Sequence, residues 1–131
     1  MYLVIIDANV WIKFTRSKNI LPLLDRFDAY NLVPVVNNYL LSEIFDALID
    51  NKWMTDSRAT ATLEFIKRVA SMQVERAVYR LSPDPKDNSL FYLAIQNNAA
   101  FIITDDTRLL SLKLKPRLIK SSSWFLKNFP V

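Results

Sequence analysis

The sequence predicts a three-layer α/β/α protein with a central, mainly parallel sheet. Its segments at 2–6 and 101–104 are almost continuously apolar and rich in Val and Ile, which is typical of strands buried on both faces. Segments with a helical spacing of apolar residues, such as 38–51, lie between the strands. Strands that alternate with helices over short connections form parallel sheets with helices on both faces.

In the first half of the chain, apolar runs predict the strands and apolar periodicity predicts the helices. Pro34 has no amide hydrogen, so the second strand should lie at an edge of the sheet or be irregular. The expected elements are a strand at 2–6, helices at 10–14 and 20–30, a strand at 32–36, and helices at 38–51 and 56–72.

In the second half, capping residues mark the helix ends. Asp84 and Pro85 are typical of a helix start, and Asn97 and Asn98 can end that helix in place of glycine. Since the chain has no glycine, we expect left-handed backbone at 37–38 as well as 97–98. The expected elements are a strand at 74–81, a helix from 84 to 98, a strand at 101–104, a helix at 107–112, a strand at 117–119 and a serine-capped helix at 121–129.

Length and composition predict one domain that spans residues 1–131. The chain is 51% hydrophobic and 23% charged, enough to bury a core. No apolar run reaches the roughly 20 residues that a membrane span needs, and the start does not resemble a signal peptide. We therefore expect a cytoplasmic protein that does not associate with membranes.

Three residue types are missing, and each absence excludes a class of site. Without Cys the chain has no disulfide, thiolate zinc site or cysteine nucleophile. Without His it has no serine–histidine triad, and without Gly it has no glycine-rich phosphate loop. Carboxylates, hydroxyls, Lys and a metal held by oxygen ligands remain available for catalysis.

Positive charge is concentrated at the end of the chain. Residues 1–106 carry 11 basic and 13 acidic side chains, whereas residues 107–131 carry 6 basic side chains and no acid. A basic tail suits a polyanionic partner, although a solvated surface explains the pattern equally well. The candidate phosphate contacts are Lys13, Arg16, Lys18, Lys115, Arg117 and Lys120.

Acidic residues follow two of the predicted strands. Asp7 comes directly after 2–6, and Asp105 and Asp106 come directly after 101–104. If the strands are parallel, these carboxylates emerge at the same edge of the sheet, where ligands bind in such folds. Each of them could instead be only a helix cap.

Two further acids lie on predicted helices. Asp87 shares a helix face with apolar residues, so it either needs a compensating cation or serves the helix dipole at the N-terminus. Glu43 lies at the edge of an apolar stripe and could belong to an ordinary solvated face. If Asp7, Glu43, Asp87 and Asp106 converge, they require a hard cation such as Mg²⁺ or Mn²⁺, which activates water. Neutralising Asp106 should then raise the melting temperature of the metal-free protein.

Four segments carry a recognisable pattern in order along almost the whole chain. They are Val-Ile-Ile-Asp-Ala-Asn-Val at 4–10, Ser-Glu-Ile at 42–44, Asp-Pro-Lys-Asp-Asn at 84–88, and Phe-Ile-Ile-Thr-Asp-Asp at 101–106 followed by Leu109 and Leu110. Together they resemble the PIN-domain nucleases, in particular the toxin components of bacterial and archaeal toxin–antitoxin pairs. Asp105 departs from this pattern, because the family often has glycine there, and the spacing favours Asp106 over Asp105 as the metal ligand.

The resemblance implies a function and a site. Asp7, Glu43, Asp87 and Asp106 would bind Mg²⁺ or Mn²⁺ and form the catalytic set, with Asn9, Thr104 and Asp105 in support. It also implies a metal-dependent endoribonuclease, a small antitoxin as partner, and a homodimer. Two alternatives remain open, namely a non-catalytic adaptor that binds nucleic acid or protein, and a metal-dependent phosphatase that acts on small substrates.

Overall fold

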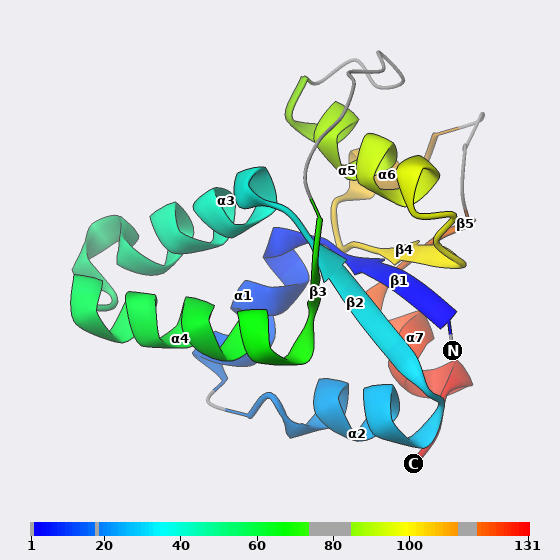
Figure 1. The fold of residues 1–131 in the computed structure, drawn as a ribbon, viewed down its shortest axis with the longest axis horizontal. Coiled ribbons are helices and arrows are strands. Elements are labelled where there is room, and N and C mark those ends of the chain that lie inside the picture. The colour runs from blue at the N-terminus through cyan, green and yellow to red at the C-terminus, as the bar shows by residue number, and fades with distance from the viewer. Residues whose placement is uncertain (1, 18, 74–84, 113–117) are drawn as a thin grey trace.

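Among the residues that the structure describes, five parallel strands form the centre of the protein (Figure 1). The structure is a computed structural model that describes residues 2–17, 19–73, 85–112 and 118–131; the side chains of residues 51 and 85–88 are not described. All the strand pairings found there are parallel, and the order across the sheet is β3-β2-β1-β4-β5. The strands are β1 (Tyr2–Ile6), β2 (Leu32–Val36), β3 (Ser71–Met72), β4 (Phe101–Ile103) and β5 (Leu118–Lys120).

Helices cover both faces of this sheet, as the sequence predicts (Figure 1). Helices α2 and α7 lie together on one side, where Arg26 donates to the Leu126 carbonyl at 3.0 Å, and α5 lies on the other side. Helices α3 and α4 pack on each other and project beyond the sheet. The helices are α1 (Ala8–Arg16), α2 (Leu21–Ala29), α3 (Asn38–Ile49), the 3-10 turn η1 (Asp50–Lys52), α4 (Asp56–Val69), α5 (Pro85–Gln96), α6 (Thr107–Leu110) and α7 (Ser122–Asn128).

Strand β3 includes residues that the sequence predicts as the end of a helix. Helix α4 ends at Val69 rather than continuing to Met72, and Ser71–Met72 pair with Val35–Val36 of β2. Pairing with a buried strand overrides the helical pattern of this segment. The strand predicted at 74–81 lies outside the described residues.

Strand β2 lies inside the sheet, so the prediction of an edge strand from Pro34 is wrong. Val36 faces β3, because its carbonyl accepts from the Gln73 amide at 2.8 Å. Pro34, two residues earlier, faces the same way, and β3 pairs only from Val35 onward. The missing amide hydrogen of Pro34 therefore removes no bond from the pairing with β3.

The left-handed positions are only partly those predicted. Asn98 has a φ of 49° at the end of α5, as expected, but within the described ranges the other positive φ values, 54° and 58°, belong to Asn31 and Lys52. Asn37 has a φ of −131° and instead caps α3, where its side chain accepts from the Leu40 amide at 2.8 Å.

The core lies on both faces of the central strands. Residues 4–6 of β1 and 102–103 of β4 are fully buried, as is Trp11 of α1. Burial of this apolar surface fixes β1 and β4 side by side, with Ile6 opposite Ile103. Within the described ranges no helix is long and apolar enough to cross a membrane.

Candidate active site

The candidate site lies at the carboxyl ends of β1 and β4. From β1 the chain runs to β2 and β3 on one side, and later to β4 and β5 on the other. The order therefore switches between β1 and β4, which is where ligands bind in open parallel sheets. Residues 7 and 104–106 follow these two strands directly, as the sequence predicts.

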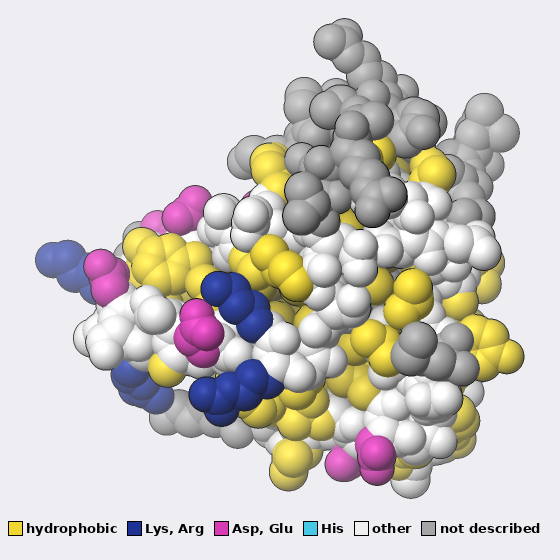
Figure 2. All heavy atoms as spheres, viewed as in Figure 1, with side chains coloured by type: hydrophobic (Ala, Val, Ile, Leu, Met, Phe, Trp, Pro, Cys, Tyr) yellow, Lys and Arg dark blue, Asp and Glu magenta, His cyan; other side chains and the backbone are white. Residues whose placement is uncertain are grey.

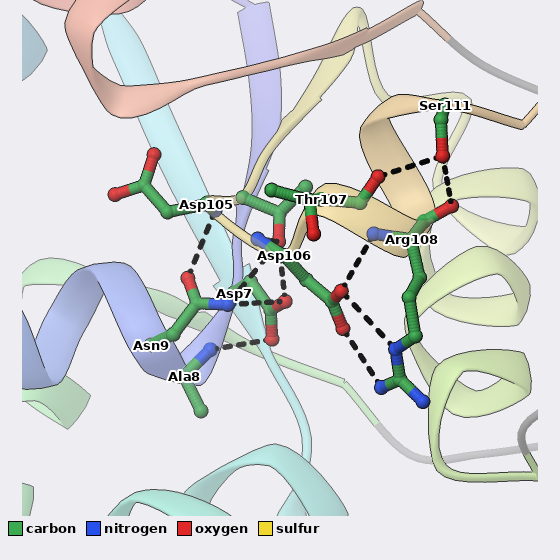
Figure 3. Close-up of polar contacts among 9 residues, drawn as sticks. Asp7, Ala8, Asn9, Asp105, Asp106, Thr107, Arg108 and Ser111 are labelled. Atoms are coloured by element: carbon green, nitrogen blue, oxygen red, sulfur yellow. Dashed lines mark hydrogen bonds and ion pairs between the residues drawn. The ribbon is translucent and has the colours of Figure 1, made fainter.

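Asp7 links the end of β1 to the start of α1 (Figure 3). Its Oδ1 accepts from the Ala8 amide at 2.7 Å, so it caps the helix, and its Oδ2 accepts from the Thr104 hydroxyl at 2.7 Å. The Asn9 amide group donates to the same Oδ2 at 3.3 Å. Asp7 thus serves as a helix cap and also contacts the end of the neighbouring strand.

Asn9 and Thr104 hold the β4–α6 connection against Asp7. The Thr104 hydroxyl accepts from the Asp106 amide at 3.1 Å, and the Asn9 Oδ1 accepts from the Asp105 amide at 3.1 Å. Thr104 is fully buried. Through these hydrogen bonds the two residues hold the Asp7 carboxylate and the backbone of Asp105 and Asp106 in place.

Burial is the main influence on the Asp7 carboxyl, and it raises its pKa. The hydrogen bonds from Thr104 and Ala8 oppose this rise, while the nearby charges of Asp106 and Asp105 add to it. A bound cation would stabilise the ionised form of such a carboxyl, because it would replace the hydration lost on burial.

Asp106 lies in a different environment, although it also caps a helix. Its Oδ1 accepts from the Arg108 amide at 2.9 Å at the start of α6. The Arg108 guanidinium binds the same carboxylate through Nη2–Oδ2 at 3.0 Å and Nε–Oδ1 at 3.3 Å (Figure 3). Hydrogen bonds from this side chain are the main reason that the pKa of Asp106 is lowered.

Asp105 binds the start of α7. Its carboxylate accepts from the Ser122 amide at 2.9 Å and from the Ser122 hydroxyl at 2.7 Å. Lys13 Nζ lies 3.6 Å from Asp105 Oδ2 and 3.1 Å from Ser122 Oγ. These contacts tie β4, α1 and α7 together, so Asp105 has a structural role.

Glu43 and Asp7 line the same narrow crevice between α3 and α5. It has a volume of about 10 Å³, roughly room for one water, and its other lining residues are Asn37, Tyr39, Leu40, Ser89, Leu90 and Leu93. A larger open groove of about 370 Å³ lies by α4, and its lining residues are Thr15, Ile20, Arg58, Ala61, Thr62 and Phe65. We take the small crevice as the candidate active site, because no acid is among the described residues that line the groove.

The acids that could hold a metal are only partly brought together. Asp7 and Glu43 offer oxygen ligands of the kind that hard divalent cations take. Asp87 lies in the first turn of α5, but its side chain is not described. Within the described part of the chain, no group of three acids is close enough to hold a metal, and the Asp106 carboxylate is bound by Arg108.

The predicted phosphate contacts do not form one surface among the described residues. Lys13 lies at the site, whereas Arg16 packs 5.1 Å from the Trp53 ring and Lys120 lies 5.2 Å from the Trp124 ring. Figure 2 shows Lys and Arg over the α3–α4 region interspersed with Asp and Glu. Lys18, Lys115 and Arg117 lie outside the described residues, as does the predicted cap Asp84.

Sequence reasoning missed several polar residues at the site. Asn37 is almost fully buried, and its amide group donates to Ser89 Oγ at 3.5 Å, which joins α3 to α5. Ser122 is equally buried against Asp105. The position of Asn37 between an apolar strand and an apolar helix is the signal of a cap that could have identified it.

Comparison with known proteins now identifies the family. The family profile described as "PIN domain" matches residues 3–108. The chain therefore belongs to the PIN-domain family. PIN domains are generally nucleases, and the predicted resemblance to this family is confirmed.

The fold comparison agrees with this assignment. The chain resembles a solved structure described as VapBC2 from Rickettsia felis bound to a DNA fragment from their promoter, with a TM-score of 0.68. The identity is 11%, and the match covers 91% of this chain and 98% of that chain. Comparison with curated protein sequences gives no significant match. This likeness supports the α/β/α fold of the PIN domain.

Proposed function

We propose that this PIN domain is a metal-dependent endoribonuclease, and that it acts as the toxin of a toxin–antitoxin pair. The observation that carries the proposal is the Asp7 carboxylate. It lies at the switch point of the sheet, is desolvated enough to raise its pKa, and shares a crevice with Glu43. A structural cap needs neither the burial nor the second acid.

The proposed metal is Mg²⁺, with Mn²⁺ as a substitute, because the ligand set contains only oxygen atoms. Asp7, Glu43, Asp87 and Asp106 would hold it, and it would supply an activated water for phosphodiester hydrolysis. Asn9 and Thr104 would keep the Asp7 oxygens in place through their hydrogen bonds. Lys13, fixed beside Asp105, would attract the RNA backbone.

The proposed partners are RNA, an antitoxin protein and a second copy of this chain. Likeness of fold to a VapBC2 structure bound to promoter DNA supports an antitoxin partner. The basic residues near the end of the chain suit a polyanionic substrate.

Cleavage of a single-stranded RNA by the purified protein tests the proposal. We expect cleavage with Mg²⁺ or Mn²⁺ and none in excess EDTA. The Glu43→Gln variant should lose at least about 100-fold in rate, as is usual when one charge-stabilising group of an active site is removed. The matched control is Asp46→Asn, because Asp46 lies three residues away on α3 but is exposed. Cleavage that persists in EDTA would contradict the metal mechanism, and turnover of nitrophenyl phosphate alone would favour the phosphatase alternative.

A further inference from the structure

Arg108 binds both carboxylate oxygens of Asp106, one of the acids of the proposed metal site. Its guanidinium contacts Asp106 Oδ2 at 3.0 Å and Oδ1 at 3.3 Å, and its amide contacts Oδ1 at 2.9 Å. A planar guanidinium that binds both oxygens of a carboxylate neutralises it and occupies the positions that a metal ion would need. Arg108 therefore acts as the counter-ion of Asp106 in the metal-free protein.

Among the residues that the structure describes, Asp7 has no such counter-ion. The ion pairs found within the described ranges join Lys13 to Asp105, Lys67 to Glu64, and Arg108 to Asp106, and none of them includes Asp7. A divalent cation that enters at Asp7 and Asp106 must therefore compete with Arg108 for the Asp106 oxygens. The cation and the guanidinium also repel each other at such short distance.

Water reaches the Arg108 end of this ion pair. The Arg108 side chain is 69% exposed, against 20% for Asp106, and water that reaches one member of an ion pair weakens the pair. Once released, the guanidinium remains within two residues of the proposed metal ligand. Its fork of N–H donors matches the oxygens of a phosphate as well as those of a carboxylate.

We propose that Arg108 is an exchangeable phosphate-binding residue: it pairs with Asp106 until a divalent cation takes that carboxylate, and then binds a backbone phosphate of the RNA at the site. The inference rests on the proposed nuclease function and adds a residue that the family resemblance does not assign. It predicts that metal and RNA binding are coupled through one side chain.

The first test measures Mn²⁺ binding to the RNA-free protein by electron paramagnetic resonance. Removal of the competing cation in Arg108→Gln should tighten Mn²⁺ binding by about twofold to fivefold, the size expected for an exposed ion pair. Arg108→Lys keeps the charge but not the fork, so it should fall between this variant and the wild type. The matched control is Arg68→Gln, an exposed arginine on α4, which should bind Mn²⁺ as the wild type does.

The second test measures binding of a labelled single-stranded RNA by fluorescence anisotropy, in EDTA and in Ca²⁺. Ca²⁺ binds the same oxygen ligands and serves here as the probe. In EDTA, Arg108 stays on Asp106, so Arg108→Gln should bind RNA about as well as the wild type. In Ca²⁺, the variant should bind roughly tenfold more weakly, the usual cost of losing a hydrogen bond to a charged group.

The outcomes separate this inference from the proposed function. Equal weakening of RNA binding in EDTA and in Ca²⁺ would mean that Arg108 contributes only its charge, and unchanged Mn²⁺ affinity would mean that it does not compete with the metal. Either result overturns the exchange while leaving metal-dependent cleavage intact. Failure of the wild type to bind Mn²⁺ would overturn both the exchange and the metal mechanism. Circular dichroism melts of all variants check that each one is folded.

Discussion

Asp7 and Asp106 have the same local role but opposite environments. Each follows a parallel strand, caps the next helix and accepts a hydrogen bond from a backbone amide. Burial raises the pKa of Asp7, whereas the Arg108 side chain lowers that of Asp106. Local sequence thus places a carboxylate at the edge of the sheet, but tertiary contacts determine whether that carboxylate carries an uncompensated charge.

This difference divides the proposed site into two halves. Asp7 is held by uncharged donors, Thr104 and Asn9, so its negative charge remains available to a cation. Asp106 is already neutralised by Arg108 and would have to exchange its partner. We therefore expect Asp7 to dominate the affinity for metal and Asp106 to contribute once Arg108 has moved.

The largest effect that we expect is on the rate of RNA cleavage. Asp7→Asn and Asp106→Asn should each lower the rate of RNA cleavage by at least about 100-fold, because both acids are proposed to bind the catalytic metal. Asp28→Asn is the control, since Asp28 is exposed on α2. An Asp106→Asn variant with normal activity would reduce Asp106 to the cap of α6 and leave Asp7 as the active acid.

Binding of Mg²⁺ should stabilise the protein through Asp7. A ligand at about 100 times its dissociation constant adds about 2.7 kcal/mol to the free energy of unfolding, which corresponds to a rise in melting temperature on the order of 10 °C. Asp7→Asn should abolish this rise, and Asp106→Asn should reduce it. Thermal melts with and without Mg²⁺ measure the effect, and a wild type that is indifferent to Mg²⁺ contradicts the proposed site.

The sequence predicts one half of this comparison, namely the position of Asp7 and Asp106 at the same edge of the sheet. The apolar run of β1 ending at Asp7, and that of β4 ending at Thr104, place both acids at one edge because buried strands of this kind pair in parallel. The parallel direction of the strands follows from the alternation of strands and helices along the chain. These features depend on local patterns that a single chain displays.

Contacts between distant residues could not be predicted in the same way. Asp105 and Asp106 are neighbours, yet one binds Ser122, 17 residues away, and the other binds Arg108. Which of them faces α7 depends on how the β4–α6 connection turns, and no periodicity records that. Strand β3 was missed for a similar reason, because two residues acquire strand geometry only by pairing with β2.

Titration of the two carboxyls in the metal-free protein should show the opposite shifts directly. Carbon-13 NMR of labelled aspartate should give Asp7 a pKa above 3.8 and Asp106 a pKa below it. The consequences for stability have opposite signs. As pH rises from about 3.8, the unfolded chain loses the Asp7 proton first. The contribution of Asp7 to stability therefore falls until the folded carboxyl has also ionised, and it stays lost at higher pH. Asp106 stabilises the fold above 3.8, and that contribution is lost as pH falls through its lowered folded value. Shifts of the same sign would mean that the two sites share one environment.

The smallest expected effect is the melting temperature of Asp106→Asn in EDTA at low salt, and it opposes the expectation from the sequence. A cluster of unpaired acids would make this variant more stable, because it removes repulsion with Asp7. Hydrogen bonding to Arg108 is the main influence on Asp106. Loss of the Asp106 charge should therefore lower the melting temperature by more than the relief of repulsion with Asp7 raises it. Asn keeps the helix cap, so the change removes only the ion pair, which is worth up to about 1 kcal/mol, or about 4 °C.

A double-mutant cycle with Arg108→Gln isolates this pair from everything else that the two substitutions change. The cost of Asp106→Asn should disappear when residue 108 is already Gln, because no ion pair is left to lose. It should also shrink as salt screens the exposed guanidinium. The double variant with Asp106→Asn and Arg108→Gln could instead melt above the Arg108→Gln variant. The gain would then come from relief of the repulsion between Asp106 and Asp7, which is no longer offset by the counter-ion. That result would place the two acids close enough to bind one metal ion. No change in that background would mean that Asp7 and Asp106 are electrostatically independent, and the metal would then have to be held from the Asp7 and Glu43 side alone.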